Sequence, residues 1–590
     1  MNSPKKGKQT PVSKNKLSTK NAYTPTYLLA FFCAIAAFLL YVNTIKHDYA
    51  LDDVGVIREN QFVQQGIKGI PKIMSIDMWH FDNMNLGYYR PLSLITFAIE
   101  NEFFPNNPHI SHLNNVLLYA LTGFFLCLLL MRIFKTVSPF FSFLIVLLFL
   151  AHPIHTEVVA NIKSRDELLS FLNLLIALLF FYKADESPKR RSLLLLGSLV
   201  FFYFALLSKE TAMAGILLAP LVLYFKKDLN LKKSFLKSLP FLIVIVVFQY
   251  QKLKMLGSIS GIMPKDIVNY PYAETGTKFP AVFLIFAQCI RMLVFPHPLS
   301  YDYSYNQLPV SGFAAAGVIA GLLCVIGLVY FMGKEFKKKS DLAFGILIFA
   351  VTLAPALAFV LLRGGIFAER FLYAPALGFS VALVSFIWHG LKLPDFNFAK
   401  TKQFFSAVAI CGLIFSLYSF KTVMRNPAWH DNLTLFSTDV NSSTNSCQVH
   451  RHCGGELINL GMAESDPKRK LEWFEKGSFE LKEALRINPH FGEALFKLGV
   501  AYQTVKLNND SAIFYYSLAI REMPGYAVSY NNLGILYEST GKQELASYYY
   551  NKSVEVNPYF PDGVRNRDNH HKRTGLDIKN LPGGTIPFSK

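Results

Sequence analysis

The chain has 590 residues, of which 52% are hydrophobic and only 17% are charged, a composition that excludes an ordinary soluble enzyme. Its formal net charge of +19 could suggest a nucleic-acid partner. However, the basic residues are not gathered into one domain with interleaved aromatic residues. We therefore predict a membrane protein that has no nucleic-acid partner.

A basic tail, 1–26, precedes the first apolar run, which extends from Leu28 to Ile45. This run is too long for the hydrophobic part of a signal peptide, and no convincing small-residue cleavage site follows it. It predicts an uncleaved anchor with the amino-terminal tail in the cytoplasm. Similar runs recur along the chain, and each is close to the length that crosses about 30 Å of hydrocarbon as a helix.

The apolar runs predict an all-α membrane helix bundle in a transmembrane domain at 27–420. Eleven crossings are expected, near residues 27–45, 114–134, 138–151, 167–183, 192–207, 211–225, 235–250, 312–332, 342–362, 372–390 and 403–420. The apolar stretch from Pro280 to Phe295 is predicted to be re-entrant or interfacial. If it crossed the membrane, the lysines at 334–339 would lie on the wrong side.

Basic clusters between the apolar runs predict the sidedness of the bundle, because such clusters are normally cytoplasmic. The clusters are Lys5 to Lys20, Arg132 with Lys135, Lys183 with Lys189 to Arg191, Lys226 to Lys237, Lys334 to Lys339 and Lys392 to Lys402. The external connections then hold Asp52, Asp53, Glu157, Asp166, Glu167, Glu210, Asp302 and Glu369. The carboxyl terminus is also predicted to be external.

A second pattern begins after a linker at 421–449. The last complete unit has Leu533-Gly534, Tyr537, Gly541, Ala546, Tyr550 and Pro558, which is the tetratricopeptide order. Two earlier units have Leu498-Gly499, Tyr502, Ala512, Tyr516, Ala519 and Pro524, and more loosely Leu460-Gly461, Ala484 and Pro489. About three repeats at 450–562 predict a short α-solenoid that binds peptides or proteins, or else caps the membrane domain. A flexible tail is expected at 563–590, and Cys447 and Cys453 could form a local disulfide.

The first external loop, 46–113, contains the adjacent acids Asp52 and Asp53. Two carboxylates at the water-exposed mouth of an apolar bundle cost free energy, so they indicate a place where chemistry occurs. One can act as a general base toward an acceptor hydroxyl while the other orients it or raises its pKa. A helix-cap or turn pair is the alternative. Arg90, later in the loop, could be their counter-ion or a phosphate clamp.

The second external loop contains His152, His155, Glu157 and Arg165. Their spacing invites a metal site, but Pro153 interrupts helical geometry and no fixed ligand motif is met. No metal ion and no other cofactor are therefore predicted. A polar substrate pocket with Arg165 facing a phosphate is favoured over a satisfied turn at a helix start.

A third external corner, 363–373, combines two glycines with Glu369, Arg370 and Tyr373. It would suit a lipid-linked phosphate whose tail enters the bilayer beside the bundle. Arginines that snorkel at a helix end are the ordinary alternative. The chain has no P-loop, no GxGxxG and no GxSxG, so nucleotide-driven transport and serine hydrolysis have no support.

Six short motifs occur in a fixed order ahead of the repeats. They are Asp52-Asp53, Tyr89-Arg90-Pro91-Leu92, His152 to Glu157, the segment with Arg165, Phe367 to Tyr373, and Asn426-Pro427-Ala428-Trp429 with Asp431, Leu435 and Phe436. This set resembles the transmembrane and tetratricopeptide repeat containing proteins, which are similar to the protein O-mannosyltransferases of the GT-C superfamily. The resemblance covers nearly the whole chain.

The resemblance implies a GT-C membrane enzyme that moves a sugar, typically mannose, from a polyprenyl phosphate to a Ser or Thr hydroxyl of an exported protein, with inversion. The family's expected base falls on Asp52 or Asp53. We expect the departing phosphate and substrate to be held by Arg90, His152, His155, Glu157, Arg165, Glu369, Arg370 and Tyr373.

The short loops and compact tail suggest a bacterial inner-membrane member, with periplasmic repeats and an undecaprenyl phosphate carrier. Two rival functions remain. The first is a GT-C transferase that modifies a glycolipid or a surface polysaccharide. The second is a membrane-anchored repeat scaffold without enzymatic activity, against which the acids and arginines at the external corners argue.

Overall fold

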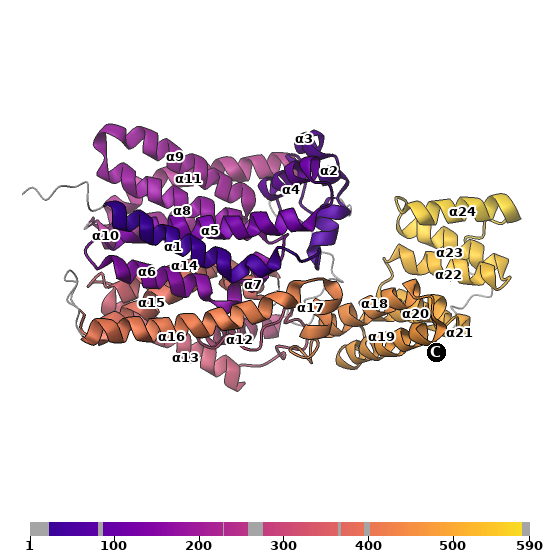
Figure 1. The fold of residues 1–590 in the computed structure, drawn as a ribbon. Coiled ribbons are helices and arrows are strands. Elements are labelled where there is room, and N and C mark those ends of the chain that lie inside the picture. The colour runs from indigo at the N-terminus through magenta and orange to yellow at the C-terminus, as the bar shows by residue number, and fades with distance from the viewer. Residues whose placement is uncertain are drawn as a thin grey trace, which may run out of the picture.

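The computed structural model describes residues 23–80, 86–227, 229–257, 275–363, 367–393 and 402–580. All regular elements in these ranges are helices, which confirms the predicted all-α class. Figure 1 shows a long bundle of apolar helices with a smaller helical array beside one of its ends. The two parts correspond to the apolar and the polar portions of the sequence.

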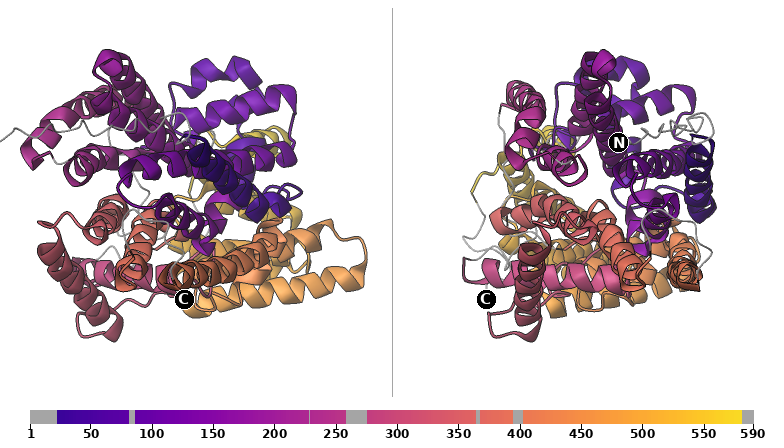
Figure 2. Two further views of the ribbon diagram at one scale, coloured as in Figure 1. Left: turned by 60° about the vertical axis from the view of Figure 1, so that its left-hand side comes forward. Right: turned by 90° about the vertical axis from the view of Figure 1, so that its left-hand side faces the viewer.

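One apolar core runs through the bundle. Its main helices are α1 Tyr23–Tyr41, α5 Pro108–Ile133, α6 Pro139–Ala151, α8 Arg165–Glu186, α9 Arg191–Ser208, α10 Gly215–Lys226, α11 Leu231–Leu256, α12 Thr275–Val294, α13 Ala316–Glu335, α14 Asp341–Arg363, α15 Pro375–Gly390 and α16 Lys402–Arg425. In the end-on view of Figure 2, right, helices from the first half of the chain lie above those from the second half. A Cβ on Gly378 would lie 2.2 Å from the Phe349 nitrogen, so α14 and α15 pack with their backbones close together.

Eight helices in the described ranges are long and apolar enough to cross a membrane. A ninth span results if α6 and the segment Pro153–Ala160, which bend by 53° at their junction, count as one. These helices support a multi-pass membrane protein, against eleven predicted crossings. Two of the predicted spans form helices of 12 and 16 residues, α10 and α15, which are short for about 30 Å of hydrocarbon. The predicted span at 235–250 lies in α11, which is not among the eight.

The segment 280–295 was predicted to be a re-entrant or interfacial element. It lies in α12, a helix of 20 residues that is among the eight candidate spans by length and composition. The prediction depended on the parity of all the other crossings, and it stays a prediction. Once the number of crossings changes, the position of the lysines at 334–339 no longer argues against a span here.

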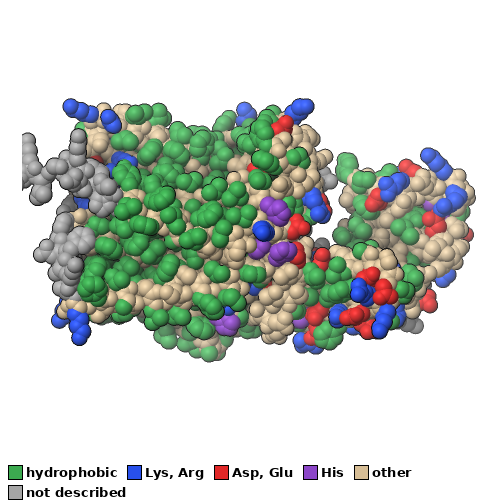
Figure 3. All heavy atoms as spheres, in the orientation of Figure 1, with side chains coloured by type: hydrophobic (Ala, Val, Ile, Leu, Met, Phe, Trp, Pro, Cys, Tyr) green, Lys and Arg blue, Asp and Glu red, His purple; other side chains and the backbone are tan. Residues whose placement is uncertain are grey.

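Basic clusters that were predicted to share one side do meet at one end of the bundle. Glu186, at the end of α8, lies 3.1 Å from Arg132, 3.4 Å from Lys135 and 3.1 Å from Lys227. At the other end, next to the array, Figure 3 shows acidic, basic and histidine side chains, while hydrophobic side chains cover the middle of the bundle. Which end faces the cytoplasm stays a prediction.

The loop after α1 folds into a compact cap over the array-side end of the bundle. Its elements are η1 Val42–Thr44, η2 Val54–Arg58, α2 Gln61–Gln64, η3 Gly66–Gly69, α3 Ile70–Ile73 and α4 Pro91–Phe103. A small core that includes Val56, Val63 and Phe97 from this loop also contains Ile162. The cap is therefore packed against the connection between α7, Thr156–Ala160, and α8.

The predicted linker is a packed connection between the bundle and the array. It contains η9 Asn426–Trp429 and α17 Asn432–Asp439. The Asp439 carboxylate accepts two hydrogen bonds from Arg425, at 2.5 and 2.7 Å, and one from the Tyr301 backbone N–H at 2.7 Å. Because Asp439 is fully buried, these bonds stabilise its charge and fix the direction of α17.

The array consists of paired helices with one recurring close contact. Its helices are α18 Cys447–Ala463, α19 Pro467–Ile487, α20 Gly492–Thr504, α21 Asn509–Glu522, α22 Ala527–Ser539, α23 Gln543–Val556 and α24 Pro561–Thr574. A Cβ on Gly499 would lie 2.5 Å from the Tyr516 ring, and one on Gly534 would lie 2.6 Å from the Tyr550 ring. The same contact between a glycine and a tyrosine therefore occurs within each of two successive helix pairs, α20 with α21 and α22 with α23.

Two features of the polar region bear on what the sequence left open. Cys447 and Cys453 are both free and buried in α18. Six residues along one helix separate them by about 9 Å, which is too far for a disulfide. The predicted tail starts within α24, and beyond that helix the Ile578 N–H donates to the Ser547 Oγ at 2.9 Å. Residues 581–590 lie outside the described ranges.

Candidate active site

The two adjacent aspartates of the first loop have different surroundings. Asp53 is fully buried, and its carboxylate accepts hydrogen bonds from the backbone N–H groups of Ala50 at 3.1 Å, Ile162 at 3.4 Å and Lys163 at 2.6 Å. Burial raises the pKa of Asp53 to about 7, although these donors favour its ionised form. Asp53 thus ties the first loop to the loop before α8.

Asp52 faces outward from the same turn. Its side chain is 42% exposed, and the Lys163 Nζ lies 3.8 Å from one of its oxygens. That separation is longer than a normal hydrogen bond, so the carboxylate is only loosely paired. Of the two aspartates, Asp52 is therefore the one that a group from outside the protein can approach.

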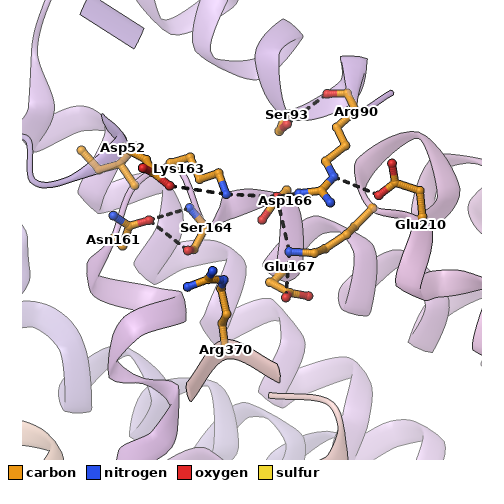
Figure 4. A network of polar contacts seen from close by, with 12 residues as sticks. Asp52, Arg90, Ser93, Asn161, Lys163, Ser164, Asp166, Glu167, Glu210 and Arg370 are labelled. Carbon is orange, nitrogen blue, oxygen red and sulfur yellow. Dashed lines mark hydrogen bonds and ion pairs between the residues drawn. The ribbon is translucent and has the colours of Figure 1, made fainter. Parts of the chain in front are cut away.

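A network of alternating charges extends from Asp52 into the bundle (Figure 4). The Lys163 Nζ also lies 3.9 Å from Asp166, which is buried at the start of α8. Asp166 in turn lies 2.8 Å from the Arg90 Nη1 and 3.5 Å from the Lys209 Nζ. Three cations from three different loops therefore surround one buried acid.

Two further acids complete this network. The Arg90 Nε donates to Glu210 at 2.9 Å, and the Lys209 Nζ lies 2.8 Å from Glu167. Lys252 of α11 lies 3.8 Å from Glu210. Arg90, which the sequence suggested as a counter-ion or a phosphate clamp, is thus held between two carboxylates, and the contacts favour the counter-ion role.

Arg370 approaches the network from the opposite side. Its backbone N–H and its Nη1 bind the buried Glu157, at 2.8 and 2.5 Å. The side chain is 34% exposed, and Figure 4 shows its guanidinium directed toward the charged network. Within the described ranges its Nε and Nη2 atoms have no hydrogen-bond acceptor. Glu157 therefore holds Arg370 and leaves part of the guanidinium available.

Glu369 lies beside Arg370 in the sequence but binds elsewhere. It is buried, and its Oε1 accepts hydrogen bonds from the Ser300 N–H at 2.7 Å and the Tyr303 hydroxyl at 2.6 Å. Burial raises the pKa of Glu369 to about 8. These contacts favour a role in fixing the segment at 298–304 over direct contact with substrate.

Arg165 belongs to a separate buried cluster. Its Nε donates to Asn115 at 2.7 Å, its Nη2 donates to the Ser111 carbonyl at 2.9 Å, and its Nη1 binds both Thr96 and Glu100. The side chain is 1% exposed. These bonds join α8 to α4 and α5, so the contacts favour a structural role for Arg165 over the predicted phosphate contact.

The two histidines that were predicted to line a substrate pocket lie in the interior, and so does Tyr373, which was predicted at the corner for a lipid-linked phosphate. The His152 Nδ1 accepts from the Ile154 N–H at 3.3 Å, and its Nε2 lies 3.0 Å from the Leu293 carbonyl oxygen. The ring of His155 packs 4.9 Å from that of Tyr373 and 4.5 Å from that of Phe149. All three predicted residues are buried, which favours packing beneath the loop.

Six residues of the network were not among the predicted site residues. They are Lys163, Asp166, Glu167, Lys209, Glu210 and Lys252. All except Lys252 lie at corners that the sequence analysis had already placed on the external side. Of the third corner, residues 364–366 lie outside the described ranges. Among the residues that are described, no three His, Cys, Asp or Glu side chains are placed to hold a metal ion.

Comparison with known proteins identifies relatives of one kind, although no protein-family model matches the chain. Human protein O-mannosyl-transferase TMTC1 is 26% identical over 539 residues, which cover 80% of this chain and 56% of the relative. Mouse TMTC4 is 24% identical over 74% of this chain and 65% of the relative, and mouse TMTC3 is 22% identical over 89% and 60%. The chain thus spans between about half and two thirds of the length of these relatives. The resemblance inferred from the motifs is confirmed: the chain is a distant homologue of the TMTC protein O-mannosyl-transferases.

Proposed function

We propose that the protein is a membrane glycosyltransferase that moves mannose from a polyprenyl phosphate to Ser or Thr hydroxyls of exported proteins. The observation that carries this proposal is the position of Asp52, which is half exposed and loosely paired beside a cluster of cations. A base must be within reach of the acceptor hydroxyl, and a cation must be within reach of the leaving phosphate. The distant homology to protein O-mannosyl-transferases supports the same reaction.

In the proposed reaction Asp52 takes the proton of the acceptor hydroxyl. The hydroxyl oxygen forms a bond to the anomeric carbon on the face opposite the phosphate. The bond between that carbon and the phosphate oxygen breaks, and its electron pair leaves with the lipid phosphate. One displacement of this kind inverts the anomeric carbon and requires no nucleotide sugar.

Arg370 and Lys163 are the cations that we assign to the leaving phosphate. Glu157 binds one guanidinium nitrogen of Arg370 and leaves the other two available, and among the described residues no acid lies closer than 3.8 Å to the Lys163 Nζ. A phosphate could therefore bind both without displacing a strong ion pair. Arg90 and Lys209 have shorter bonds to Glu210 and Glu167, and we assign them to holding this arrangement.

We further propose that the array is a set of tetratricopeptide repeats that presents the acceptor protein. The recurrence of the Gly499 contact with Tyr516 as Gly534 with Tyr550 supports a repeated unit. The connection contacts the turn before Asp52, because Asn432 of α17 accepts a hydrogen bond from the Leu51 N–H, and Figure 1 shows the array next to α17. On this proposal both face the external compartment.

The test uses the purified full-length protein in lipid vesicles with a labelled polyprenyl-phosphate mannose and an unfolded secreted protein as acceptor. Asp52→Asn should abolish the label on the acceptor while the protein stays folded. Asp48→Asn is the matched control, because Asp48 lies in the same loop and is exposed. If only glycolipid or glycan is labelled, the enzyme transfers mannose to that acceptor and not to a protein. Full activity of Asp52→Asn, or no label with any acceptor, would overturn it.

A further inference from the structure

Leu51, directly before Asp52, has a backbone conformation that disfavours leucine. Its φ is +56°, in the left-handed region. A Cβ in this region approaches the following carbonyl oxygen, so glycine and asparagine are the residues that normally occupy it. The conformation must therefore be imposed by contacts from outside the turn.

Three side chains hold this turn. The Asn432 Oδ1 accepts a hydrogen bond from the Leu51 N–H at 2.6 Å. The Asp53 carboxylate accepts from the Ala50 N–H at 3.1 Å, and the Asn161 Nδ2 donates to the Ala50 carbonyl at 3.3 Å. The hydrogen bond from the Leu51 N–H reaches a segment 381 positions away, and the Leu51 side chain packs against the core that contains Trp429 and Leu435.

Asn432 is held firmly enough to impose this conformation. It is the first residue of α17, where the Asp431 side chain caps the helix by accepting from the Thr434 N–H at 2.8 Å. The backbone also joins the two segments, because the Asp48 N–H donates to the His430 carbonyl at 2.8 Å. The amide of Asn432 thus approaches Leu51 from a fixed position.

We propose that Asn432 is a positioning residue for Asp52. By holding Leu51 in the left-handed conformation, it turns the Asp52 carboxylate outward while Asp53 faces the interior. This inference rests on the proposed function, in which Asp52 is the base. It also makes the connection to the array, through α17, part of the geometry of the site.

The first experiment compares Asn432→Ala with Asn432→Asp in the vesicle transfer assay. The alanine variant should lower kcat about 10-fold, with the KM for the lipid donor unchanged, because Leu51 then relaxes toward ordinary backbone conformations. The aspartate variant keeps an oxygen at the same position and should retain most of the activity. Asn441→Ala, an exposed asparagine in the same connection, is the matched control. An unchanged kcat in Asn432→Ala would overturn the proposal.

Rescue by glycine gives a readout that general destabilisation would not. Glycine adopts a positive φ without the steric cost. Leu51→Gly in the Asn432→Ala background should therefore recover kcat to within about 3-fold of Leu51→Gly alone. Leu507 has a φ of +55° in the array and is exposed, so Leu507→Gly should give no rescue. Failure of the Leu51→Gly rescue, or failure of the double variant to fold, would assign Asn432 to stability and overturn the proposal.

Hydrogen exchange separates this proposal from the proposed function. The Leu51 amide should exchange faster in Asn432→Ala than in the parent protein, and at the parent rate in Asn432→Asp. Suppose that Asp52→Asn is inactive, while in Asn432→Ala the Leu51 amide exchanges at the parent rate and kcat is unchanged. In that case only the positioning role of Asn432 fails. If Asp52→Asn is active, the proposed function fails, and the positioning role fails with it even where exchange shows that the hydrogen bond exists.

Discussion

Lys163 and Arg165 are two residues apart, yet they differ in how completely the surrounding residues pair their positive charges. Arg165 is 1% exposed and binds Glu100, Thr96, Asn115 and the Ser111 carbonyl. The Lys163 Nζ faces the charged network, where the carboxylates nearest to it lie 3.8 and 3.9 Å away. The hydrogen-bonding groups of Arg165 are therefore occupied by other residues of the protein, whereas the ammonium group of Lys163 is only loosely paired.

This difference separates structure from chemistry at the same end of the bundle. A buried charge is stable only when it is paired and hydrogen-bonded, which is the case for Arg165. A binding site instead needs charges that the free protein satisfies incompletely, so that a ligand can complete them. Around Lys163, Asp52 and Arg370 this second condition holds. The following changes test the distinction.

Arg165→Met should have the largest effect on stability. It leaves Glu100 without its closest cation and opens the contacts between α8 and α4, which should lower the free energy of unfolding by about 3–5 kcal/mol. Thermal unfolding in detergent measures this. Arg521→Met is the control, because Arg521 is exposed and pairs with its neighbour Glu522, so its removal should cost less than about 0.5 kcal/mol. If Arg165→Met is as stable as the parent protein but has lost transfer activity, the result would instead support the prediction that Arg165 contacts a phosphate.

Lys163→Met should have a small effect on stability and a large effect on transfer activity. The lysine stem is buried and methionine can fill its space, so the free energy of unfolding should change by less than about 1 kcal/mol. Transfer should fall about 100-fold, because one of the two cations assigned to the leaving phosphate is lost. The measurement pairs kcat with the unfolding temperature of the same sample. If stability falls in proportion to activity, Lys163 belongs to the structural region and the comparison fails.

Much of the bundle could be predicted because composition and length decide whether a segment can cross a membrane. The runs that became α1, α5, α8 and α13 are of this kind. The placement of α12 could not be predicted in the same way, because it required every other crossing to be counted correctly. The array could also be predicted in outline, since a glycine such as Gly534 must be small where Tyr550 packs against it.

The site could be predicted only in part. The corners that meet at the site were identified from their charged residues, but the difference between Asp52 and Asp53 arises in a turn where Leu51 has a positive φ and its N–H donates to Asn432, 381 positions away. No local pattern contains that information. Lys209 could not be recognised, because a lysine beside an acid looks the same in sequence whether it is solvated or, as here, buried beside Asp166.

The smallest predicted effect concerns pH and lies in the array, away from both regions. His450 is buried in α18, with its Nδ1 2.6 Å from Glu480 and its Nε2 3.1 Å from the Thr444 carbonyl oxygen. Burial opposes its charge, but the hydrogen bonds to these two acceptors and the nearby Glu483 carboxylate outweigh it and raise the pKa of His450 above 6.5. Both ring nitrogens therefore donate when the imidazole is charged.

A raised pKa in the folded state means that His450 contributes its full stability below pH 6.5 and loses it as pH rises through the folded-state value. We expect the parent protein to lose about 1 kcal/mol more than His450→Gln between pH 6 and pH 9. Unfolding temperatures across that range measure the difference, and Glu480→Gln should remove the same pH dependence because it removes the charged acceptor. Parallel curves for parent and His450→Gln would mean that the imidazole stays neutral, and that burial in the array prevails over the carboxylate at 2.6 Å.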